Sequence, residues 1–363
     1  MMKRLFYVSR FTRPLTKRDI DAIRASASRY NHEHGVTGIL VCLGDMFFQA
    51  LEGKGAIVDK LYYERIHRDK RHKNLLCLNS VNGVSARMFP DWDMQVFNLN
   101  EETEVLPIAF RQTLTALLES NHIISQYTQP SILRMLERGV NPTLIKPRRL
   151  RATVLFSDIV GFSFFAERLK PVELIDLINS HIDACTEQID RHGGQVNKLL
   201  GDGILAYFPQ QETDAALAAA TNILEEMNRR RRHASRASPH HLLYGGIGLA
   251  NGMVYEGNIG PALKRDFTIL GNTVNLASRL ESLTRVLKVQ LITTASVADR
   301  ARTSWGFQSL GTHTLKGQLK AVEIFGLKPL QSLHVDELYQ QITEFLRSKG
   351  AERATAQNAS SDL

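Results

Sequence analysis

Two aspartates in the second half of the chain have the surroundings of metal ligands. Asp158 follows the apolar and β-branched residues 153–156, which predict a strand, and Asp202 lies in a Gly-Asp-Gly turn that predicts the tip of a hairpin. Mg²⁺ suits such a pair, because proteins hold this ion with few carboxylates and leave other positions to substrate phosphates. The two aspartates therefore predict a divalent-metal site.

An asparagine and an arginine farther along have the spacing of one helical face. Asn275 and Arg279 are four residues apart in R-D-F-T-I-L-G-N-T-V-N-L-A-S-R-L-E, and residues four apart are neighbours on a helix. The apolar residues beside them give the same helix its packed face. Two carboxylates for metal, followed by an Asn and an Arg for a phosphate ester, indicate phosphoryl chemistry on a nucleotide.

The length and composition indicate an ordinary globular protein of two domains. At 363 residues the chain exceeds a typical single core, and 43% of its residues are hydrophobic and 23% charged. The formal charge of +8 is concentrated in Lys146–Arg151 and Arg229–Arg232. Neither run has interleaved aromatic residues, so we interpret them as a linker and a solvated loop, and we expect no nucleic-acid partner.

The cysteines and the hydropathy pattern indicate a cytoplasmic protein. Cys42, Cys77 and Cys185 are widely spaced and follow no metal-binding pattern, which is typical of buried thiols in a reducing compartment. No stretch approaches the roughly 20 apolar residues that span a bilayer, and the N-terminus has no long apolar segment. We therefore expect a soluble protein without a membrane partner.

The elements expected in residues 1–100 make a small α+β domain. Thr16 caps a helix that runs to about Glu33, and Gly35 stands where the helix stops. Gly44-Asp45 predicts a two-residue hairpin turn. The strands are expected at 4–9, 36–43, 46–51, 75–79 and 96–99, and a second helix at 55–68. Their order is βαββαββ.

The rest of the chain divides into a connector, a second α+β domain and a tail. Residues 101–124 have helical periodicity, and 125–150 are rich in proline, glycine and basic residues, so 101–150 is expected to be a helical connector and linker. The second domain is expected at 151–330, and a C-terminal helix with a tail disordered from residue 350 at 331–363. The elements expected in the second domain are strand 152–157, helices 162–168 and 172–191, hairpin 195–208, helix 212–229, strands 243–249, 252–256 and 267–270, helix 272–286 and strand 289–293.

In this order over residues 151–328, the motifs resemble class III nucleotide cyclases. The resemblance implies a ferredoxin-like α+β fold that converts a nucleoside triphosphate to a 3′,5′-cyclic monophosphate and pyrophosphate. It implies that Asp158, Ile159 and Asp202 are the ligands of two divalent cations, Mg²⁺ or Mn²⁺. Taken singly, Asp158 could be a helix N-cap and Asp202 a turn residue.

The same resemblance implies catalytic and phosphate-binding roles. Arg279 matches the arginine that stabilises charge on the α-phosphate, and Asn275 matches the asparagine that orients the ribose. Lys316, in T-L-K-G, matches a lysine on the terminal phosphates, although an ordinary surface lysine fits nearly as well. In the family the metal-binding and transition-state residues come from different subunits, so a head-to-tail homodimer is expected. Asn272 replaces the family's aspartate and can still cap its helix.

The residue four positions before Asp202 indicates whether the substrate nucleotide carries adenine or guanine. In the family a lysine there, with an Asp or Thr, reads adenine, whereas guanine readers carry Glu. Lys198 and Thr268 fit the adenine pattern, with Asp266 orienting the lysine. Lysine donates to adenine N1, and a hydroxyl or carboxylate accepts from the 6-amino group. ATP is therefore the expected substrate, and a guanylyl cyclase is the alternative.

A tyrosine and a glutamine lie inside apolar strands of the first domain. Tyr7 and Gln49 need partners there, because an unsatisfied buried amide costs about 1–3 kcal/mol. On neighbouring strands they could simply satisfy each other.

Residues 3–98, however, resemble BLUF domains, which are blue-light sensors that bind a flavin. The matching motifs are K-R-L-F-Y-V-S, N-x-x-x-x-V-T-G-I-L at Asn31–Leu40, F-F-Q-A-L-E-G at 47–53, R-H at 71–72 and M-F-P-D-W-D-M at 88–94.

The resemblance to BLUF domains implies roles around FAD or another flavin. Light drives electron and proton transfer from the tyrosine, here Tyr7, and the amide of Gln49 then changes its hydrogen bonds. Asn31 bonds the edge of the flavin ring, and the segment of Trp92 and Met94 reports the switch. Arg71 and His72 either contact the flavin tail or close the preceding helix.

Together the two resemblances are to bacterial photoactivated adenylyl cyclases. They imply an α+β protein of two ferredoxin-like domains joined by a helical connector. Light at the flavin is expected to shift the cyclase dimer toward a closed arrangement. A rival interpretation is a flavin-binding regulator whose second domain binds nucleotide without turnover.

Overall fold

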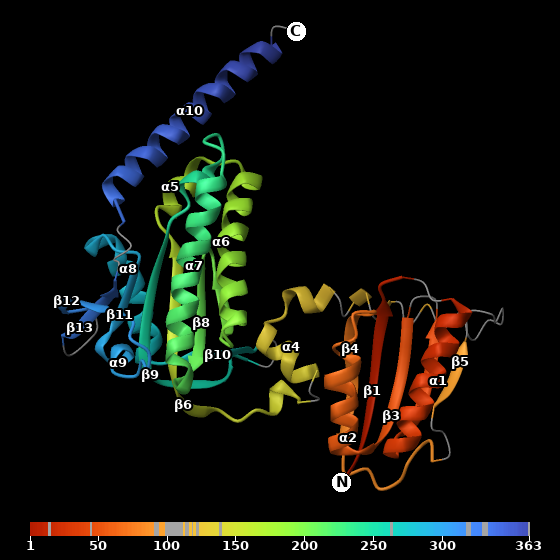
Figure 1. Ribbon diagram of the computed structural model, residues 1–363. Helices are drawn as coiled ribbons and strands as arrows, with labels where there is room; N and C mark the ends of the chain where they lie inside the picture. The colour runs from red at the N-terminus through yellow and green to blue at the C-terminus, as the bar shows by residue number, and fades with distance from the viewer. Residues whose placement is uncertain are drawn as a thin grey trace. The chain divides into compact units, whose positions relative to one another are not determined.

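The chain folds into two compact units, Met1–Leu144 and Ile145–Leu363 (Figure 1). The computed structural model describes residues 1–13, 16–43, 46–90, 94–98, 112, 116–117, 119–120, 123–137, 140–261, 264–316, 321–328 and 333–361. The expected turn at Gly44-Asp45, Trp92 and most of the expected helix 101–124 lie outside these residues. No helix in the described ranges is long and apolar enough to cross a membrane.

The first unit is a five-stranded sheet with two helical segments on one face. One segment is α1, and the other is the continuous stretch of α2 and η1. The strand order is β4-β1-β3-β2-β5, with β2 and β5 parallel and the other pairs antiparallel. Side chains of α1, α2 and η1 join one face of the sheet in a single apolar core. The expected order βαββαββ is thus confirmed. The elements are β1 (Met2–Phe11), α1 (Lys17–His34), β2 (Thr37–Leu43), β3 (Met46–Lys54), α2 (Gly55–Asp59), the π-helix η1 (Lys60–Ile66), β4 (His72–Asn82) and β5 (Gln95–Asn98).

The ends of α1 follow from their sequence. Thr16 accepts a hydrogen bond from the backbone of Asp19, and the Asp19 carboxylate accepts one from the Thr16 backbone, which makes a capping box. Gly35 ends the helix with φ of 62°, a left-handed conformation that glycine adopts without a Cβ clash. Both predicted helix boundaries are confirmed.

The expected connector, residues 101–150, contains a helix in its described part that was not predicted from the sequence. This helix, α4 (Pro130–Glu137), packs against β4, and η2 (Pro142–Leu144) follows it. Strand β6 then begins at Arg148, three residues earlier than the expected start of the second domain.

The second unit is built around an eight-stranded sheet, as far as its described residues show. The order is β12-β13-β11-β9-β6-β8-β7, and β10 pairs with β9. The strands are β6 (Arg148–Ile159), β7 (Gln195–Leu200), β8 (Gly203–Pro209), β9 (Gly245–Ile259), β10 (Asp266–Leu270), β11 (Leu291–Thr294), β12 (Phe307–His313) and β13 (Val322–Leu327). The helices are α5 (Phe162–Arg168), α6 (Pro171–Arg191), α7 (Thr213–His233), α8 (Asn272–Leu287), α9 (Ala295–Ala298) and α10 (Val335–Ser361), with short 3₁₀ turns η3 (Gln210–Glu212) and η4 (Pro239–Leu242).

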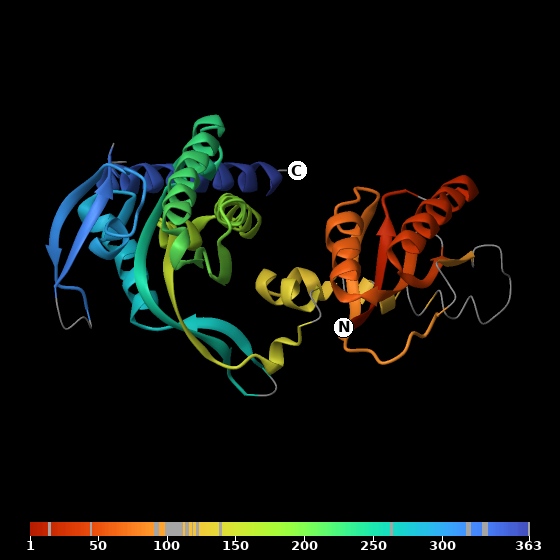
Figure 2. The same ribbon diagram turned by 60° about the horizontal axis from the view of Figure 1, so that its bottom comes forward.

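Both faces of this sheet are buried, so successive residues of its central strands enter different cores. Leu155 of β6 packs with α6 and α7, whereas its neighbour Val154 packs with α8. Figures 1 and 2 show α6 and α7 side by side over one face of the sheet. This arrangement explains the continuous apolar runs of β6 and β8.

Three elements of the second unit differ from the sequence-based expectation. Residues 245–259 form one strand, not two, because β9 pairs with β6 through the Asn251-Gly252 position that resembles a turn. Strands β12 and β13 and helix α9 were not predicted. Helix α10 continues to Ser361, although disorder was expected from residue 350; its final residues are rich in the helix formers Ala, Glu, Arg and Gln.

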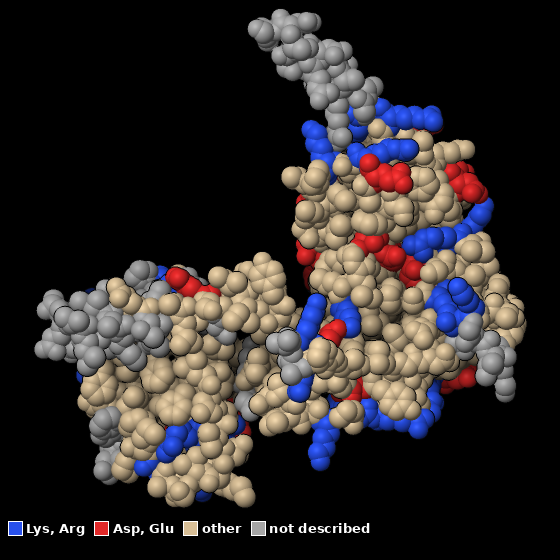
Figure 3. All heavy atoms as spheres, turned by 180° about the vertical axis from the view of Figure 1, so that it is seen from behind, with Lys and Arg blue, Asp and Glu red and all other residues tan. Residues whose placement is uncertain are grey.

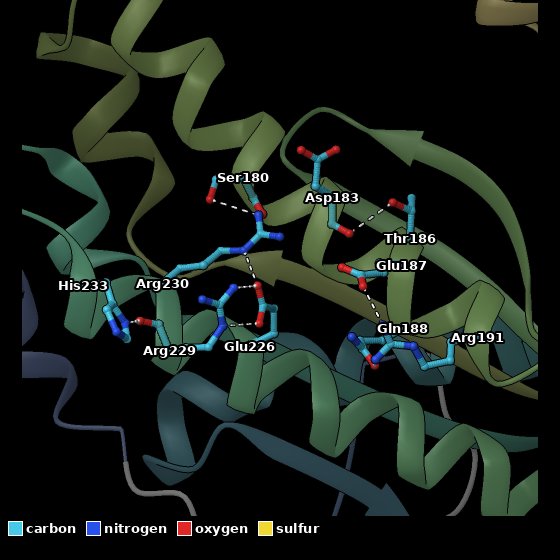
Figure 4. Close-up of polar contacts among 10 residues, drawn as sticks. All are labelled: Ser180, Asp183, Thr186, Glu187, Gln188, Arg191, Glu226, Arg229, Arg230 and His233. Carbon is cyan, nitrogen blue, oxygen red and sulfur yellow. Dashed lines mark hydrogen bonds and ion pairs between the residues drawn. The ribbon is translucent and has the colours of Figure 1, made fainter. Parts of the chain in front are cut away.

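The two basic runs are also structured, contrary to the linker and loop interpretation. Arg148–Arg151 belong to β6, and the guanidinium Nε of Arg148 lies 2.5 Å from Glu256 Oε2. Arg229–Arg232 form the last turn of α7. Figure 4 shows Arg229 and Arg230 both directed at Glu226, and Arg230 also donates to the Ser180 carbonyl at 2.7 Å. Arg148, Arg229 and Arg230 thus have carboxylate partners within the second unit.

The charged residues visible on one face of the second unit are mixed in sign. Figure 3 shows blue and red side chains scattered over this face rather than gathered in one basic area. This distribution agrees with the ion pairs of Arg148, Arg229 and Arg230.

Candidate functional sites

A cavity of about 250 Å³ lies between the helices and the sheet of the first unit. It is mostly apolar, with a few polar groups from both sides, as is usual for pockets that hold a cofactor. Its lining residues are Tyr7, Phe11, Ala22, Ile23, Ser26, Ala27, Tyr30, Asn31, Leu40, Phe47, Gln49, Leu61, Arg65, Ile66, Asp69, Arg71 and His72. Five of the seven residues expected to bind flavin are among them.

Tyr7 and Gln49 face each other across two strands of this pocket. They are direct partners in the antiparallel pairing of β1 and β3, and the Tyr7 hydroxyl donates a hydrogen bond to Gln49 Oε1. The Gln49 amide nitrogen donates to the sulfur of Met94 at 3.4 Å. Burial raises the pKa of the Tyr7 hydroxyl well above its usual range, so the hydroxyl keeps its proton. The tyrosine and the glutamine therefore satisfy each other, as the alternative to a flavin role allowed.

Three more of the residues expected to bind flavin, Asn31, Arg71 and His72, line the same cavity. Asn31, at the end of α1, is 1% exposed and lines it. The Arg71 guanidinium is held by Asp69, with Nη2 2.6 Å from Oδ2, at the rim. His72 Nδ1 lies 2.8 Å from the Ser9 hydroxyl, and burial lowers the pKa of its imidazole.

Glu52, which was not singled out from the sequence, lies on the same strand as Gln49 and makes several hydrogen bonds. It is fully buried three residues after Gln49 on β3. Its carboxylate accepts from Arg4 Nε at 2.5 Å, and from the backbone nitrogens of Met88 and Phe89 at 2.8 and 2.9 Å. These bonds tie the strand of Gln49 to the loop that leads to Met94. A buried carboxylate in the apolar F-F-Q-A-L-E run was the available signal.

In the second unit, Asp158 and Asp202 converge where β6 ends and the β7–β8 turn begins. The backbone nitrogen of Ile159 lies 3.0 Å from Asp158 Oδ1 and 3.3 Å from Asp202 Oδ2, so both carboxylates meet at this amide. Gly201 supplies the tight turn with φ of 71°. Burial, together with the adjacent Asp158 carboxylate, raises the pKa of Asp202.

The donor set suits a hard divalent cation. Two carboxylates at close range repel each other unless a cation joins them, and oxygen ligands of this kind suit Mg²⁺ or Mn²⁺. Across the described ranges no three His, Cys, Asp or Glu side chains cluster as a metal cage. A cation here would therefore take further ligands from backbone, water and substrate.

Arg285 is the cation that the chain itself brings to this site. Its Nη2 lies 3.7 Å from Asp158 Oδ2 and 3.4 Å from the Ile159 carbonyl oxygen, while Nη1 pairs with Glu281 at 2.6 Å. Burial raises the pKa of Glu281 to about 7, against the opposing effect of Arg285. No local signal in the sequence indicates that Arg285 contacts Asp158 and Ile159, because both residues are more than 100 positions away.

A buried histidine contacts the backbone of Asp202 and the residue that precedes Asp158. His181 of α6 has Nδ1 2.8 Å from the Asp202 carbonyl oxygen and Nε2 3.0 Å from the Ser157 hydroxyl. A carbonyl only accepts, so Nδ1 carries the proton and Nε2 accepts from Ser157. Burial lowers the pKa of His181 to about 4, which keeps the imidazole neutral. His181 was missed because one histidine on an apolar helix face resembles ordinary core.

Asn275 and Arg279 lie on α8, which packs very closely on β9. A Cβ at Gly248 would lie 2.1 Å from the Ala277 carbonyl oxygen, so only glycine allows this approach. Arg279 Nη1 is buried and makes no hydrogen bond with any described residue, and Asn275 is exposed. Within the described part of one chain, no hydrogen bond or ion pair joins either residue to Asp158 or Asp202.

The three residues expected to read the base come together at β7 and β10. Lys198 forms an ion pair with Asp266, as expected. The Thr268 hydroxyl donates to Asn197 Oδ1 at 2.8 Å, and both of these residues are 2% exposed. Lys316 is exposed, at the edge of the described segment 264–316. Asn197 was missed, although a lone amide in an apolar strand is the same signal that singled out Gln49.

The two units match two known domain families. Residues 2–95 match the BLUF family, described as sensors of blue-light using FAD. Residues 146–329 match the adenylate and guanylate cyclase catalytic domain. The first unit is thus a flavin-binding photosensor domain, and the second a class III cyclase domain with a nucleotide substrate and divalent metals.

The proteins similar to this chain include light-regulated adenylyl cyclases. A solved structure of a bacterial light-regulated adenylyl cyclase superposes with a TM-score of 0.89 and is 36% identical, covering 95% of this chain and 99% of that one. The photoactivated adenylate cyclase subunit beta of Euglena gracilis is 30% identical over 302 residues, and subunit alpha is 29% identical over 298. Each alignment covers 82% of this chain but only 34% and 29% of those longer relatives. The chain belongs to the family of photoactivated adenylyl cyclases.

Proposed function

We propose that this chain is a blue-light-activated adenylyl cyclase that converts ATP to 3′,5′-cyclic AMP and pyrophosphate. The observation that carries the proposal is the convergence of Asp158 and Asp202 in a unit that also pairs Lys198 with Asp266. The first feature fits a metal-bound triphosphate, and the second fits adenine.

Asp158, Asp202 and the carbonyl oxygen of Ile159 would hold two divalent cations, Mg²⁺ or Mn²⁺. When bound, such ions acidify the ribose 3′-hydroxyl and neutralise the triphosphate. The chain's own contribution is placement: the Ile159 amide bonds both carboxylates, and His181 holds the Asp202 turn. Lys316 would contact the terminal phosphates.

Arg279 and Asn275 would act on the substrate across a subunit interface. A buried guanidinium nitrogen without a hydrogen-bond partner in the described chain is costly, and a phosphate held by a second copy would satisfy it. Large apolar side chains are exposed on three neighbouring strands, at Leu199, Leu200, Tyr255, Ile259 and Leu270. A head-to-tail homodimer would cover them and form two composite sites.

FAD or another flavin would occupy the cavity of the first unit, with Asn31 at the ring edge. When bound, the flavin absorbs blue light and accepts an electron and a proton. Tyr7 holds its hydroxyl proton against Gln49, and the Gln49 amide holds Met94, so a change at Tyr7 reaches β5 through two hydrogen bonds. A shift in that strand would bias the cyclase dimer toward its closed arrangement.

The test is a direct assay of the purified chain with ATP and Mg²⁺ in darkness and under blue light. Cyclic AMP should form faster in the light, and GTP should be a poor substrate. A protein that binds flavin but forms no cyclic nucleotide in either condition would instead be a regulator with an inactive cyclase domain. Preferential formation of cyclic GMP would mean that the base assignment is wrong.

A further inference from the structure

We propose that Asn197 determines nucleotide specificity by fixing the hydroxyl of Thr268 as a hydrogen-bond acceptor toward the substrate base. This inference rests on the proposed adenylyl cyclase activity, with Lys198 and Thr268 as the residues that contact adenine. Asn197 itself would touch no substrate; it is a positioning residue that acts through Thr268.

The orientation of the Asn197 amide follows from its two neighbours on β10. Its Nδ2 lies 3.4 Å from the Phe267 carbonyl oxygen, and its Oδ1 lies 2.8 Å from Thr268 Oγ1. A backbone carbonyl only accepts, so the amide nitrogen must face Phe267 and the amide oxygen must face Thr268. Asn197 occupies the bulge in the pairing of β7 with β8, which lets it reach across to β10.

The direction of the Thr268 hydroxyl proton is then fixed. A hydroxyl has one proton to donate, and at Thr268 the Asn197 oxygen is the near acceptor, whereas the Ile269 carbonyl is 3.4 Å away. Thr268 is 2% exposed, so water offers little competition for that proton. With the proton committed to Asn197, the hydroxyl oxygen presents only lone pairs to any further partner.

A Thr268 hydroxyl that can only accept a hydrogen bond discriminates adenine from guanine. The 6-amino group of adenine donates and finds an acceptor, whereas O6 of guanine accepts and would meet another acceptor. Lys198 supplies the opposite polarity, because its ammonium donates to the unprotonated N1 of adenine and not to the protonated N1 of guanine. Each reading residue then has its own positioning partner, Asp266 for Lys198 and Asn197 for Thr268.

The experiment measures the ratio of kcat/KM for ATP to that for GTP, in the full-length chain under blue light. Inosine triphosphate is a second competitor, because its base resembles guanine at positions 1 and 6 but lacks the 2-amino group. Asn197→Leu is nearly isosteric and removes both amide contacts. We expect both ratios to fall about tenfold or more, because Thr268 can then turn its proton toward O6.

Two further variants separate positioning from a structural role. Asn197→Asp keeps an oxygen acceptor for the Thr268 proton but loses the donor to the Phe267 carbonyl, so its stability should fall while its ratios stay within about threefold of wild type. In a Thr268→Val background, Asn197→Leu should change neither ratio further, because the group it orients is gone. Ratios from one preparation do not depend on the fraction of folded enzyme, and Asn197→Ala repeats the test if the leucine variant does not fold.

The inference is overturned if Asn197→Leu and Asn197→Ala keep the wild-type ratios, if Asn197→Asp loses them, or if Asn197→Leu lowers them equally when Thr268 is valine. A wild-type chain that makes no cyclic AMP, or that shows no preference for ATP, would overturn the proposed function itself, and this inference with it.

Discussion

Tyr7 and Gln49 are register partners on β1 and β3, and the tyrosine hydroxyl donates to the glutamine carbonyl oxygen inside the first-unit cavity. This contact fixes the Gln49 amide, because its nitrogen must then point away from Tyr7, toward the sulfur of Met94. One buried side chain thus joins the proposed photochemical residue to the strand that would carry the signal.

Tyr7→Phe should retain the bound flavin and lose the light-induced red shift of its absorption, because phenylalanine fills the same space but has no proton or hydrogen bond to give. Absorption spectra before and after blue light measure this. Tyr62→Phe is the matched control, since Tyr62 is also fully buried, with its ring centre 5.4 Å from that of Tyr7. A normal red shift in Tyr7→Phe would remove Tyr7 from the light reaction.

Glu52→Gln should reduce the ratio of light to dark cyclase activity and leave the flavin red shift in place. The glutamine preserves size but loses the charge that binds Arg4 and one acceptor for the loop at Met88 and Phe89. The free energy of unfolding should fall by about 1–3 kcal/mol. The control is Glu64→Gln, at an exposed residue of η1. It should change neither the light-to-dark activity ratio nor the free energy of unfolding.

The same substitution has a pH signature. Burial alone would raise the pKa of Glu52, but the hydrogen bonds from Met88 and Arg4 outweigh it and lower the pKa below its usual 4.5. A lowered folded-state pKa gives stability that is present above about pH 4.5 and is lost as the pH falls through the folded-state value. Denaturation curves should show this acid sensitivity in wild type and less of it in Glu52→Gln.

Two conservative variants of His181 should separate its two hydrogen bonds. Asparagine places an amide near imidazole Nδ1 and can still donate to the Asp202 carbonyl, whereas glutamine reaches the Nε2 position and keeps only Ser157. We expect His181→Gln to raise the Mg²⁺ concentration for half-maximal activity about tenfold, and His181→Asn to change it much less. Melting temperatures should fall similarly in both. Equal metal requirements in the two variants would mean that His181 is only a packing residue.

Local signals in the sequence were sufficient for the order of the elements in the first unit and for the residues at their ends, although α4, α9, β12 and β13 were not predicted. The cap at Thr16 and the stop at Gly35 depend on residues within four positions, and both boundaries agree with the structure. The strand before Asp158 and the turn at Asp202 were readable for the same reason. Their convergence followed from the family resemblance, not from either motif alone.

Partners distant in the sequence account for what was missed. Asn197 acts on a residue 71 positions away, Glu52 on one 36 positions away, and Arg285 on one more than 100 positions away. Neither hydrophobic periodicity nor turn residues indicate contacts between residues so far apart in the sequence. The second basic run was misinterpreted for a different reason: its charge suggested solvent, although Glu226, one turn earlier on α7, is a local partner for Arg229 and Arg230.

Mixing inactive chains tests whether the active site is shared between subunits. Asp202→Ala and Arg279→Ala should each be inactive alone, because every site in either homodimer lacks one group. In a heterodimer of the two, one site has both groups and the other has neither, so an equal mixture should recover about a quarter of wild-type activity. The control is a mixture of Asp158→Ala and Asp202→Ala. Both carboxylates belong to the same half of the site, so every heterodimer has two damaged metal centres and should stay inactive. If a verified Asp202→Ala and Arg279→Ala heterodimer also stays inactive, all of these residues act within one chain.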